Sequence, residues 1–265
     1  MLNRFFDFQH KNLTSAAFLL AASAAISAVL GLIRDRLLAS RFGAGEELDV
    51  YFAAFRIPDF IYGILIMGGL SAVFLPVLAE HFTKDEKQGW LLANVVLNCF
   101  LVMLSLFCAL LAILTPWLIS FIAPGFSQAQ KELLVPLTRL MFLSPIFFGL
   151  SSVFSGVLHY FNRFLAYALA PLLYNLGIIF GILFLTPAFG VMGLGFGVIL
   201  GTFAHFAVQV PSILAAGFRY SFQLKFRYPG LVKIFKFMAW RAFGASVYHI
   251  NLIVATAIAS TLTLG

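Results

Sequence analysis

Charged side chains are scarce in this sequence. Only 10% of the 265 residues are Asp, Glu, Lys or Arg, whereas 62% are hydrophobic, and the mean hydropathy is +1.00. A soluble domain of this size carries about a quarter charged residues. The composition therefore excludes an ordinary soluble globular protein and predicts an integral membrane protein whose surface is solvated mostly by lipid.

Residues that carry catalysis or bind metals are few as well. The two cysteines, Cys99 and Cys108, fall in one hydrophobic run without CxxC spacing, which indicates apolar packing. The histidines have no partners at ligand spacing, and there is no HExxH, GxSxG or Walker motif. Residues 193–197 read GLGFG, but they follow no predicted strand and so do not predict a dinucleotide site. We expect no enzyme, no metal site and no cofactor.

The lengths of the uncharged runs predict about seven transmembrane α-helices. About 20 apolar residues cross a bilayer as a helix, and the uncharged runs cover residues 12–33, 60–79, 88–130, 140–162, 164–218 and 242–265. The third run breaks at Ala123-Pro124-Gly125, and the fifth is long enough for two spans separated by Thr186-Pro187 and Gly190. The first run is longer than a signal-peptide core and is expected to remain as a helix. Unbroken runs of this length exclude a β-barrel, whose strands alternate over about ten residues.

The distribution of basic residues predicts the orientation. With the N-terminus inside, the inside connections carry Lys84, Lys87, Arg163 and five basic residues between 219 and 236. The outside connections are poorer in unbalanced basic residues. Because Lys and Arg mark cytoplasmic loops, a cytoplasmic N-terminus is expected. Membrane topology and anionic lipid then explain the net charge of +7, and no nucleic-acid partner is expected.

Charges around the junction of the first two predicted helices form the candidate site. It consists of Arg34, Asp35, Arg36, Arg41, Asp49, Arg56 and Asp59. A charge at mid-bilayer costs about 2.5–3.5 kcal/mol, so such residues usually face a wet cavity or each other. One interpretation is a hydrated cavity whose guanidinium groups bind an anionic, phosphate-bearing substrate. The alternative is that these side chains snorkel from helix ends to the interface and close structural ion pairs, with Arg56 and Asp59 able to pair along one helical face.

Helix breakers accompany these charges. They are Gly43-Ala44-Gly45, Pro58, Gly63, Gly68, Gly69 and Pro76. Interrupted helices beside intramembrane charge are typical of transporter binding sites, although Pro and Gly are frequent in membrane helices in general. Farther along, Gly193, Gly197 and Gly201 are spaced four apart, which predicts close helix packing. His205 and Gln209 share a helical face and are expected to hydrogen-bond between helices.

Several sequence blocks follow one another in the order and spacing of a known family. They are Gly31-Leu-Ile-Arg34-Asp35-Arg36, Phe42-Gly43-Ala44-Gly45 up to Asp49, residues 51–58, Phe74-Leu-Pro76 up to Glu80, Ala123-Pro124-Gly125-Phe126, Asn162-Arg163-Phe164 with Ala170-Pro171 and Asn175, and Gln209-Val-Pro211. Over nearly its whole length the sequence resembles the MurJ (MviN) family of lipid II flippases, part of the multidrug/oligosaccharidyl-lipid/polysaccharide exporter superfamily.

The resemblance implies an all-α integral membrane protein that forms one lobe of a two-lobed flippase fold working by alternating access. Residues 1–230 would be an N-terminal transporter lobe of six transmembrane helices, and residues 231–265 a seventh helix that starts a missing second lobe. The implied cargo is lipid II, an undecaprenyl-linked peptidoglycan precursor used for the cell wall and cell shape. It would be carried from the inner to the outer leaflet of the bacterial plasma membrane.

The resemblance also assigns site residues. Arg34 matches a cavity arginine of the family, Asp49 matches an acidic residue, and Arg56 takes the place of a lysine. Arg34, Arg36, Arg41 and Arg56 are predicted to bind the substrate, and Asp35, Asp49 and Asp59 to serve in coupling or orientation. Ala28 and Tyr62 stand where the family has arginines, and Met67 where it has a glutamate.

The expected partners are a lipid-linked anionic substrate, membrane lipids and a second transporter lobe. Two alternatives stay open because so many of the family's cavity charges are absent. One is a flippase for another polyprenyl-linked glycan, and the other is a membrane scaffold that does not transport.

Overall fold

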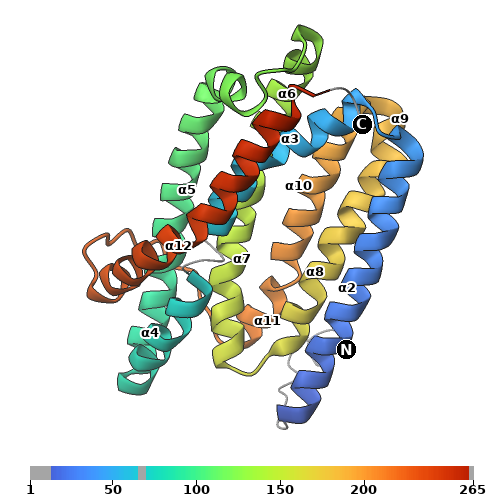
Figure 1. Cartoon of the computed structure of the whole chain (residues 1–265). Helices are drawn as coiled ribbons and strands as arrows, with labels where there is room; N and C mark the ends of the chain where they lie inside the picture. Colours follow the sequence, from blue (N-terminus) through green and yellow to red (C-terminus); the bar gives the residue numbers. More distant parts are fainter. Residues whose placement is uncertain (1–12, 65–69, 263–265) are drawn as a thin grey trace.

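The computed structural model describes residues 13–64 and 70–262, and all regular structure in these ranges is helical (Figure 1). The elements in chain order are α2 (Leu13–Phe42), α3 (Glu46–Ile61), α4 (Ser71–Lys84), α5 (Glu86–Ile122), α6 (Gln128–Met141), α7 (Leu143–Tyr160), α8 (Phe164–Phe180), the π-helical turn η2 (Gly181–Leu185), α9 (Thr186–Phe189), α10 (Val191–Ala207), α11 (Val210–Ala215) and α12 (Pro229–Ala259).

Five helical stretches are long and apolar enough to cross a membrane: Thr14–Phe42, Glu86–Ile122, Gln128–Tyr160, Phe164–Phe189 and Val191–Ala215. A sixth forms if Pro229–Gly244 and Ser246–Ala259, which meet at a bend of 43°, count as one span. The prediction of about seven helices is roughly consistent with these five or six spans of the described chain.

The second predicted helix, residues 60–79, differs most from expectation. α3 ends at Ile61 and α4 begins at Ser71, so this crossing is divided between two elements. Pro58 lies inside α3 and Pro76 inside α4. Met67, Gly68 and Gly69 lie outside the described residues.

Both predicted breaks are present. α5 ends at Ile122, and α6 starts with a capping box in which the Ser127 backbone N–H donates to Gln130 Oε1 at 2.8 Å and the Gln130 N–H donates to Ser127 Oγ at 3.3 Å. The second break falls at Gly190, where φ is +57°, a conformation that favours glycine. Pro187 lies in the first turn of α9, where backbone N–H groups have no acceptor within the helix, so the missing N–H of proline costs no helical hydrogen bond.

The predicted close packing of α10 is confirmed. A Cβ on Gly177 of α8 would lie 2.3 Å from the Gly201 Cα, and one on Gly181 would lie 2.6 Å from the Gly197 Cα. A Cβ on Gly193 would meet the Leu185 backbone at 2.5 Å. The two backbones approach so closely that only glycine fits at the crossing.

The connections gather at two ends of the bundle. In Figure 1 the C-terminal end of α2, the start of α6 and α9 lie at the upper end, whereas the start of α2, the end of α4 and α11 lie at the lower end. The connections α4–α5 and α7–α8, which carry predicted cytoplasmic basic residues, therefore share the lower end with the start of the first helix. Which side of the membrane this end faces stays a prediction.

One ion-pair cluster ties α4 to α12. Glu80 accepts hydrogen bonds from Lys233 Nζ at 2.6 Å and from Lys84 Nζ at 3.0 Å. The Lys233 and Lys84 ammonium groups lower the pKa of the Glu80 carboxyl to about 2. Glu80 follows the uncharged run of residues 60–79, so the cluster lies beyond its apolar part.

Candidate substrate cavity

A polar cavity of about 210 Å³ lies between α2 and α3. It is lined by Arg34, Asp35 and Leu38 of α2, by Tyr51, Phe52, Phe55, Arg56 and Asp59 of α3, and by Tyr174 of α8. Four of the seven predicted site residues are thus brought together: Arg34, Asp35, Arg56 and Asp59. We call this space the inner cavity.

Arg34 is held firmly at the edge of the inner cavity. Its Nε and Nη2 each lie 2.9 Å from Asp35 Oδ1, and its Nη1 donates to Asn175 Oδ1 of α8 at 3.2 Å. Asn175 Nδ2 in turn donates to Ser27 Oγ at 3.1 Å and to the Pro171 carbonyl at 3.2 Å. The Arg34 side chain is 27% exposed, whereas that of Asp35 is 60% exposed. The guanidinium is therefore fixed between two partners: Asp35 of α2, whose carboxylate is largely exposed, and Asn175 of α8.

Arg56 lies between the inner cavity and a larger one. The second space, of about 690 Å³, is bounded by Glu46, Asp49, Phe52, Ala53 and Arg56 of α3, by residues 125–127 and 130, and by residues 256, 259, 260 and 262. We call it the outer cavity, and it receives the predicted residue Asp49. The Arg56 Nε is buried and has no hydrogen-bond partner in the described part of the chain.

Three observations about charge bear on the predictions. Arg56 and Asp59 line the inner cavity from one face of α3, but no hydrogen bond or ion pair joins these two described residues. Arg36 and Arg41 are exposed and line neither cavity. Arg36 is about 200° around the helix from Arg34, so both cannot face the same space. With two arginines and two aspartates, the inner cavity has formally balanced charge, not the cationic lining expected.

Aromatic rings take up much of the remaining lining. The Tyr51 and Phe55 ring centroids are 5.0 Å apart, and Tyr62, Phe148 and Tyr174 form a chain with separations of 4.7 and 5.3 Å. Tyr62 therefore packs an aromatic ring where the family resemblance leads one to expect an arginine. Sequence reasoning missed Tyr174 because nothing in the apolar run around it marks it as a neighbour of α3.

His205 of α10 and Gln209, which directly precedes α11, form the interhelical contact that was predicted. His205 Nδ1 hydrogen-bonds with Ser151 Oγ of α7 at 2.7 Å, and Gln209 Nε2 also donates to Ser151 Oγ. Ser155 Oγ donates to Gln209 Oε1 at 3.0 Å. These bonds join α7 to α10 behind the aromatic chain, since Phe148 also contacts the His205 ring at 5.2 Å.

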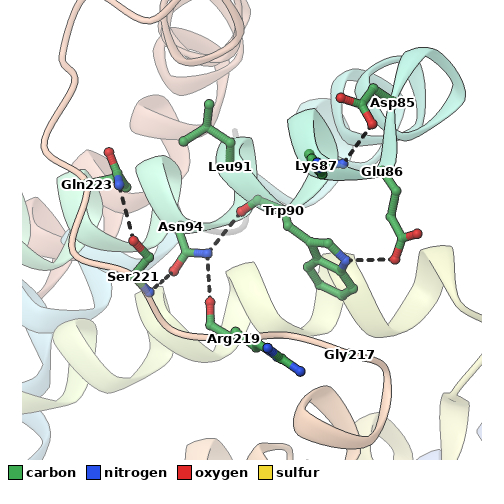
Figure 2. Close-up of a pocket in the computed structure, with 10 residues that line it drawn as sticks. All are labelled: Asp85, Glu86, Lys87, Trp90, Leu91, Asn94, Gly217, Arg219, Ser221 and Gln223. Atoms are coloured by element: carbon green, nitrogen blue, oxygen red, sulfur yellow. Dashed lines mark hydrogen bonds between the residues drawn. The ribbon is translucent and has the colours of Figure 1, made fainter.

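A further cavity, of about 540 Å³, lies between the first turns of α5 and the segment 217–223 (Figure 2). Here the side chain of the buried Asn94 bonds the backbone of the extended segment on both sides. Asn94 Nδ2 donates to the Arg219 carbonyl at 3.1 Å, and the Ser221 N–H donates to Asn94 Oδ1 at 2.7 Å. Asn98, also buried, donates to the Ser221 carbonyl at 2.9 Å and accepts from Tyr220 Oη at 2.8 Å. The side-chain amides of Asn94 and Asn98 thus bond the backbone of residues 219–221, as a neighbouring strand would do. We call these two residues and their bonds the asparagine clasp.

Comparison with known proteins gives a consistent result. A family profile described as lipid II flippase MurJ matches residues 38–265. The chain is 31% identical to the lipid II flippase MurJ of Burkholderia cenocepacia, over 96% of this chain and 51% of that protein. It is 33% identical to the probable lipid II flippase MurJ of Buchnera aphidicola, over 91% of this chain and 48% of that protein.

A solved structure, the lipid II flippase MurJ in an inward closed conformation, superimposes with a TM-score of 0.78 at 26% identity. The match covers 93% of this chain and 51% of that one. The chain thus spans about half the length of the relatives it matches.

Proposed function

Because the chain belongs to the MurJ family of lipid II flippases, we propose that this multi-pass membrane protein carries lipid II, a lipid-linked peptidoglycan precursor, across the bacterial plasma membrane by alternating access. The observation that carries the proposal is the inner cavity: Arg34 and Arg56 face a shared polar space between α2 and α3. Arginines placed in this way are suited to phosphate oxygens, which their guanidinium forks bind in pairs.

Arg34 and Arg56 have distinct parts in this proposal. Arg34 is oriented by Asp35 and Asn175, so its position is set before the cargo arrives. Arg56 has a buried Nε without a partner and lines both cavities, which suits a donor that stays with the headgroup as it moves from one cavity to the other. Asp35, Asp49 and Asp59 would orient these cations and couple the movement to ions or to the membrane potential. The exposed Arg36 and Arg41 are proposed as cargo contacts outside the inner cavity. Arg41 lies two turns beyond Arg34 on nearly the same face of α2, whereas Arg36 lies on the other side of the helix.

The same proposal covers orientation and assembly. Residues 1–230 are proposed as a six-helix transporter lobe with a cytoplasmic N-terminus, and residues 231–265 as a seventh helix leading to a second lobe. The half-length match to the relatives supports a second lobe as the partner. A transporter without chemistry of its own is favoured over an enzyme because the cavity residues serve binding and orientation.

The lining of the inner cavity also fits a second cargo. The formal charges of its lining balance, and Tyr51, Phe55 and Tyr174 contribute aromatic rings. A lining rich in arginine would bind a bare pyrophosphate more strongly than this one. Another polyprenyl-linked glycan, held by stacking of sugar rings on these aromatics as well as by a phosphate, fits such a lining.

Binding of purified protein to lipid II and to a different undecaprenyl-linked glycan tests both possibilities. Native mass spectrometry should show lipid II bound to the unmodified chain and about 10-fold weaker binding for Arg34→Gln, as expected for loss of a charge-assisted hydrogen bond. Arg227→Gln, which removes an exposed charge at the α11–α12 connection, is the matched control and should bind normally. Equal binding by Arg34→Gln would contradict the role of Arg34, and preference for the other glycan would support the second cargo.

A further inference from the structure

Arg139 places a charge on an exposed face of α6, within the candidate span Gln128–Tyr160. Its Nε donates to the Ala112 carbonyl of α5 at 2.9 Å. Ala112 lies four residues before Pro116, which has no N–H, so this carbonyl has lost its partner within the helix. Pro116 thus leaves the Ala112 carbonyl without a partner in α5, and Arg139 Nε donates a hydrogen bond to this carbonyl.

A groove of about 430 Å³ lies next to this bond. Pro116, Ile119 and Ser120 of α5 form one wall, and the other is made by Gln128, Lys131, Glu132, Val135 and Pro136 of α6. Arg139 continues the same face of α6 one turn past Val135. Long side chains on a helix lean toward its N-terminus, so the guanidinium is directed back along the groove.

The charges of the groove favour an anion. Lys131 lines the groove two turns before Arg139, about 12 Å along the helix. The Lys131 Nζ contacts only the Pro124 carbonyl, at 3.4 Å, among the bonds of the described chain. The one carboxylate, Glu132, already accepts from Gln128 Nε2 at 3.1 Å. Two cations against one carboxylate leave the groove with an excess positive charge.

The surroundings point to a lipid. Below the groove, α5 exposes the apolar side chains of Leu106, Leu110 and Ile113, which lie on one face, and Trp117 beside it is 71% exposed. Trp is enriched at the level of lipid headgroups, and intramembrane Arg is stabilised by snorkelling toward phosphates. A cationic pocket at headgroup depth above an apolar stripe matches a molecule with a phosphate and two acyl chains.

We propose that the groove between α5 and α6 is a binding site for a bilayer phospholipid, whose phosphate is held between Arg139 and Lys131 while its acyl chains follow α5. The Nε of Arg139 is anchored on Ala112, and its Nη groups bind the phosphate as a fork. The site is on the outside of the bundle, separate from the inner and outer cavities. It does not depend on the cargo that those cavities carry.

Native mass spectrometry of the full chain, titrated with dioleoylphosphatidylglycerol, tests the site. Arg139→Gln should weaken retention of one phospholipid about 10-fold, the usual size for a lost charge-assisted bond. Lys131→Gln, which leaves the Ala112 bond intact, should weaken it in the same direction and keeps the test decisive if Arg139→Gln fails to fold. Dioleoylglycerol, which lacks the phosphate, should bind weakly to every variant.

Three outcomes overturn the proposal. If Arg227→Gln, which removes the same charge from the α11–α12 connection, reduces retention as much as Lys131→Gln does, the attraction is unspecific. If both groove variants retain phosphatidylglycerol as the unmodified chain does, or if dioleoylglycerol is retained equally well, no phosphate is bound there. Pro116→Ala gives an independent check: its new N–H competes with Arg139 for the Ala112 carbonyl, so retention should fall partway.

Discussion

Arg34 shows how much of a binding side chain's geometry is decided by its neighbours. Its guanidinium is bonded to Asp35 on its own helix and to Asn175 on α8, and Asn175 is itself bonded to Ser27. Asn175 is therefore the residue that attaches the Arg34 guanidinium to α8. Without it, Arg34 would keep its charge but lose its defined direction.

Replacing Asn175 by Ala should lower stability by about 1–3 kcal/mol, because Arg34 Nη1 and Ser27 Oγ both lose a buried hydrogen-bond partner. Lipid II binding should weaken as well, since the orientation of Arg34 is no longer fixed. Thermal unfolding in detergent and native mass spectrometry measure the two effects. Asn251→Ala, at an exposed position of α12, is the control and should change neither. Unchanged stability and binding in Asn175→Ala would show that Asp35 alone positions the arginine.

At the scale of elements, the contact between α8 and α10 depends on the absence of side chains. Gly177 of α8 faces Gly201 of α10, and Gly181 faces Gly197. At each of these positions, backbone atoms of the opposite segment occupy the space that a side chain would need. The spacing within α10 predicted close packing, but the matching glycines of α8 were recognised only when the two helices were seen together. A spacing pattern identifies a packing face without naming its partner.

Gly197→Ala should destabilise the bundle by about 1–3 kcal/mol, the usual cost of overpacking, because the new Cβ would lie 2.7 Å from the Gly181 Cα. Gly31→Ala is the matched control, since a Cβ there meets nothing within 4 Å and alanine favours a helix by about 1 kcal/mol. Thermal unfolding of both variants should therefore shift in opposite directions. A neutral Gly197→Ala would mean that the two helices separate easily.

The Glu80 cluster gives the α4–α12 contact a pH dependence. Because Lys233 and Lys84 lower the folded-state pKa of Glu80 from 4.5 to about 2, the stabilisation is complete above about pH 4.5 and is lost as the pH falls through about 2. The stability difference between the unmodified chain and Glu80→Gln should be constant from pH 7 to 5 and shrink toward pH 2. Thermal unfolding at a series of pH values measures it. A difference that does not shrink would indicate that charge pairing is not the source.

Over the whole molecule, the asparagine clasp fixes the chain between α11 and α12. The clasp bonds residues 219–221 to α5, so this connection is attached to the body of the bundle just before α12 begins. If α12 leads to a second lobe, as we propose, movement of that lobe would be transmitted through a short attached segment.

Asn94→Ala combined with Asn98→Ala should release this segment. Trypsin should then cleave after Arg219, Lys225 or Arg227 about 10-fold faster, as expected when about 1–2 kcal/mol of local bonding is lost. Limited proteolysis followed by mass spectrometry identifies the sites, with Asn251→Ala as the control. Cleavage at the rate of the unmodified chain would show that packing, and not the two amides, holds the segment.

The sequence predicted what depends on composition and local spacing. Membrane helices, their breaks at residues 123–125 and Gly190, the packing face of α10 and the contacts of His205 all follow from neighbours within a few turns. The cavity could be anticipated only in part. Tyr174 reaches it from α8, and Asn175 of α8 bonds Arg34 at its edge. Arg36 is kept out of it by the rotation of α2, and Arg41 lies two turns beyond Arg34 along the helix, both of which matter only once the helices are packed. The substrate roles of the seven charged residues stay predictions.

The pairing of Arg34 with Asp35 has a consequence for turnover. An incoming phosphate would have to displace the Asp35 carboxylate from the Arg34 guanidinium. The free energy gained on binding would then be the difference between the attraction of Arg34 for the phosphate and its attraction for Asp35. Since Asp35 is largely exposed, it can swing aside and return. Under the proposed function, its return would compete with the cargo and speed dissociation. A built-in competitor of this kind would prevent the cargo from binding too tightly for repeated cycles of uptake and delivery.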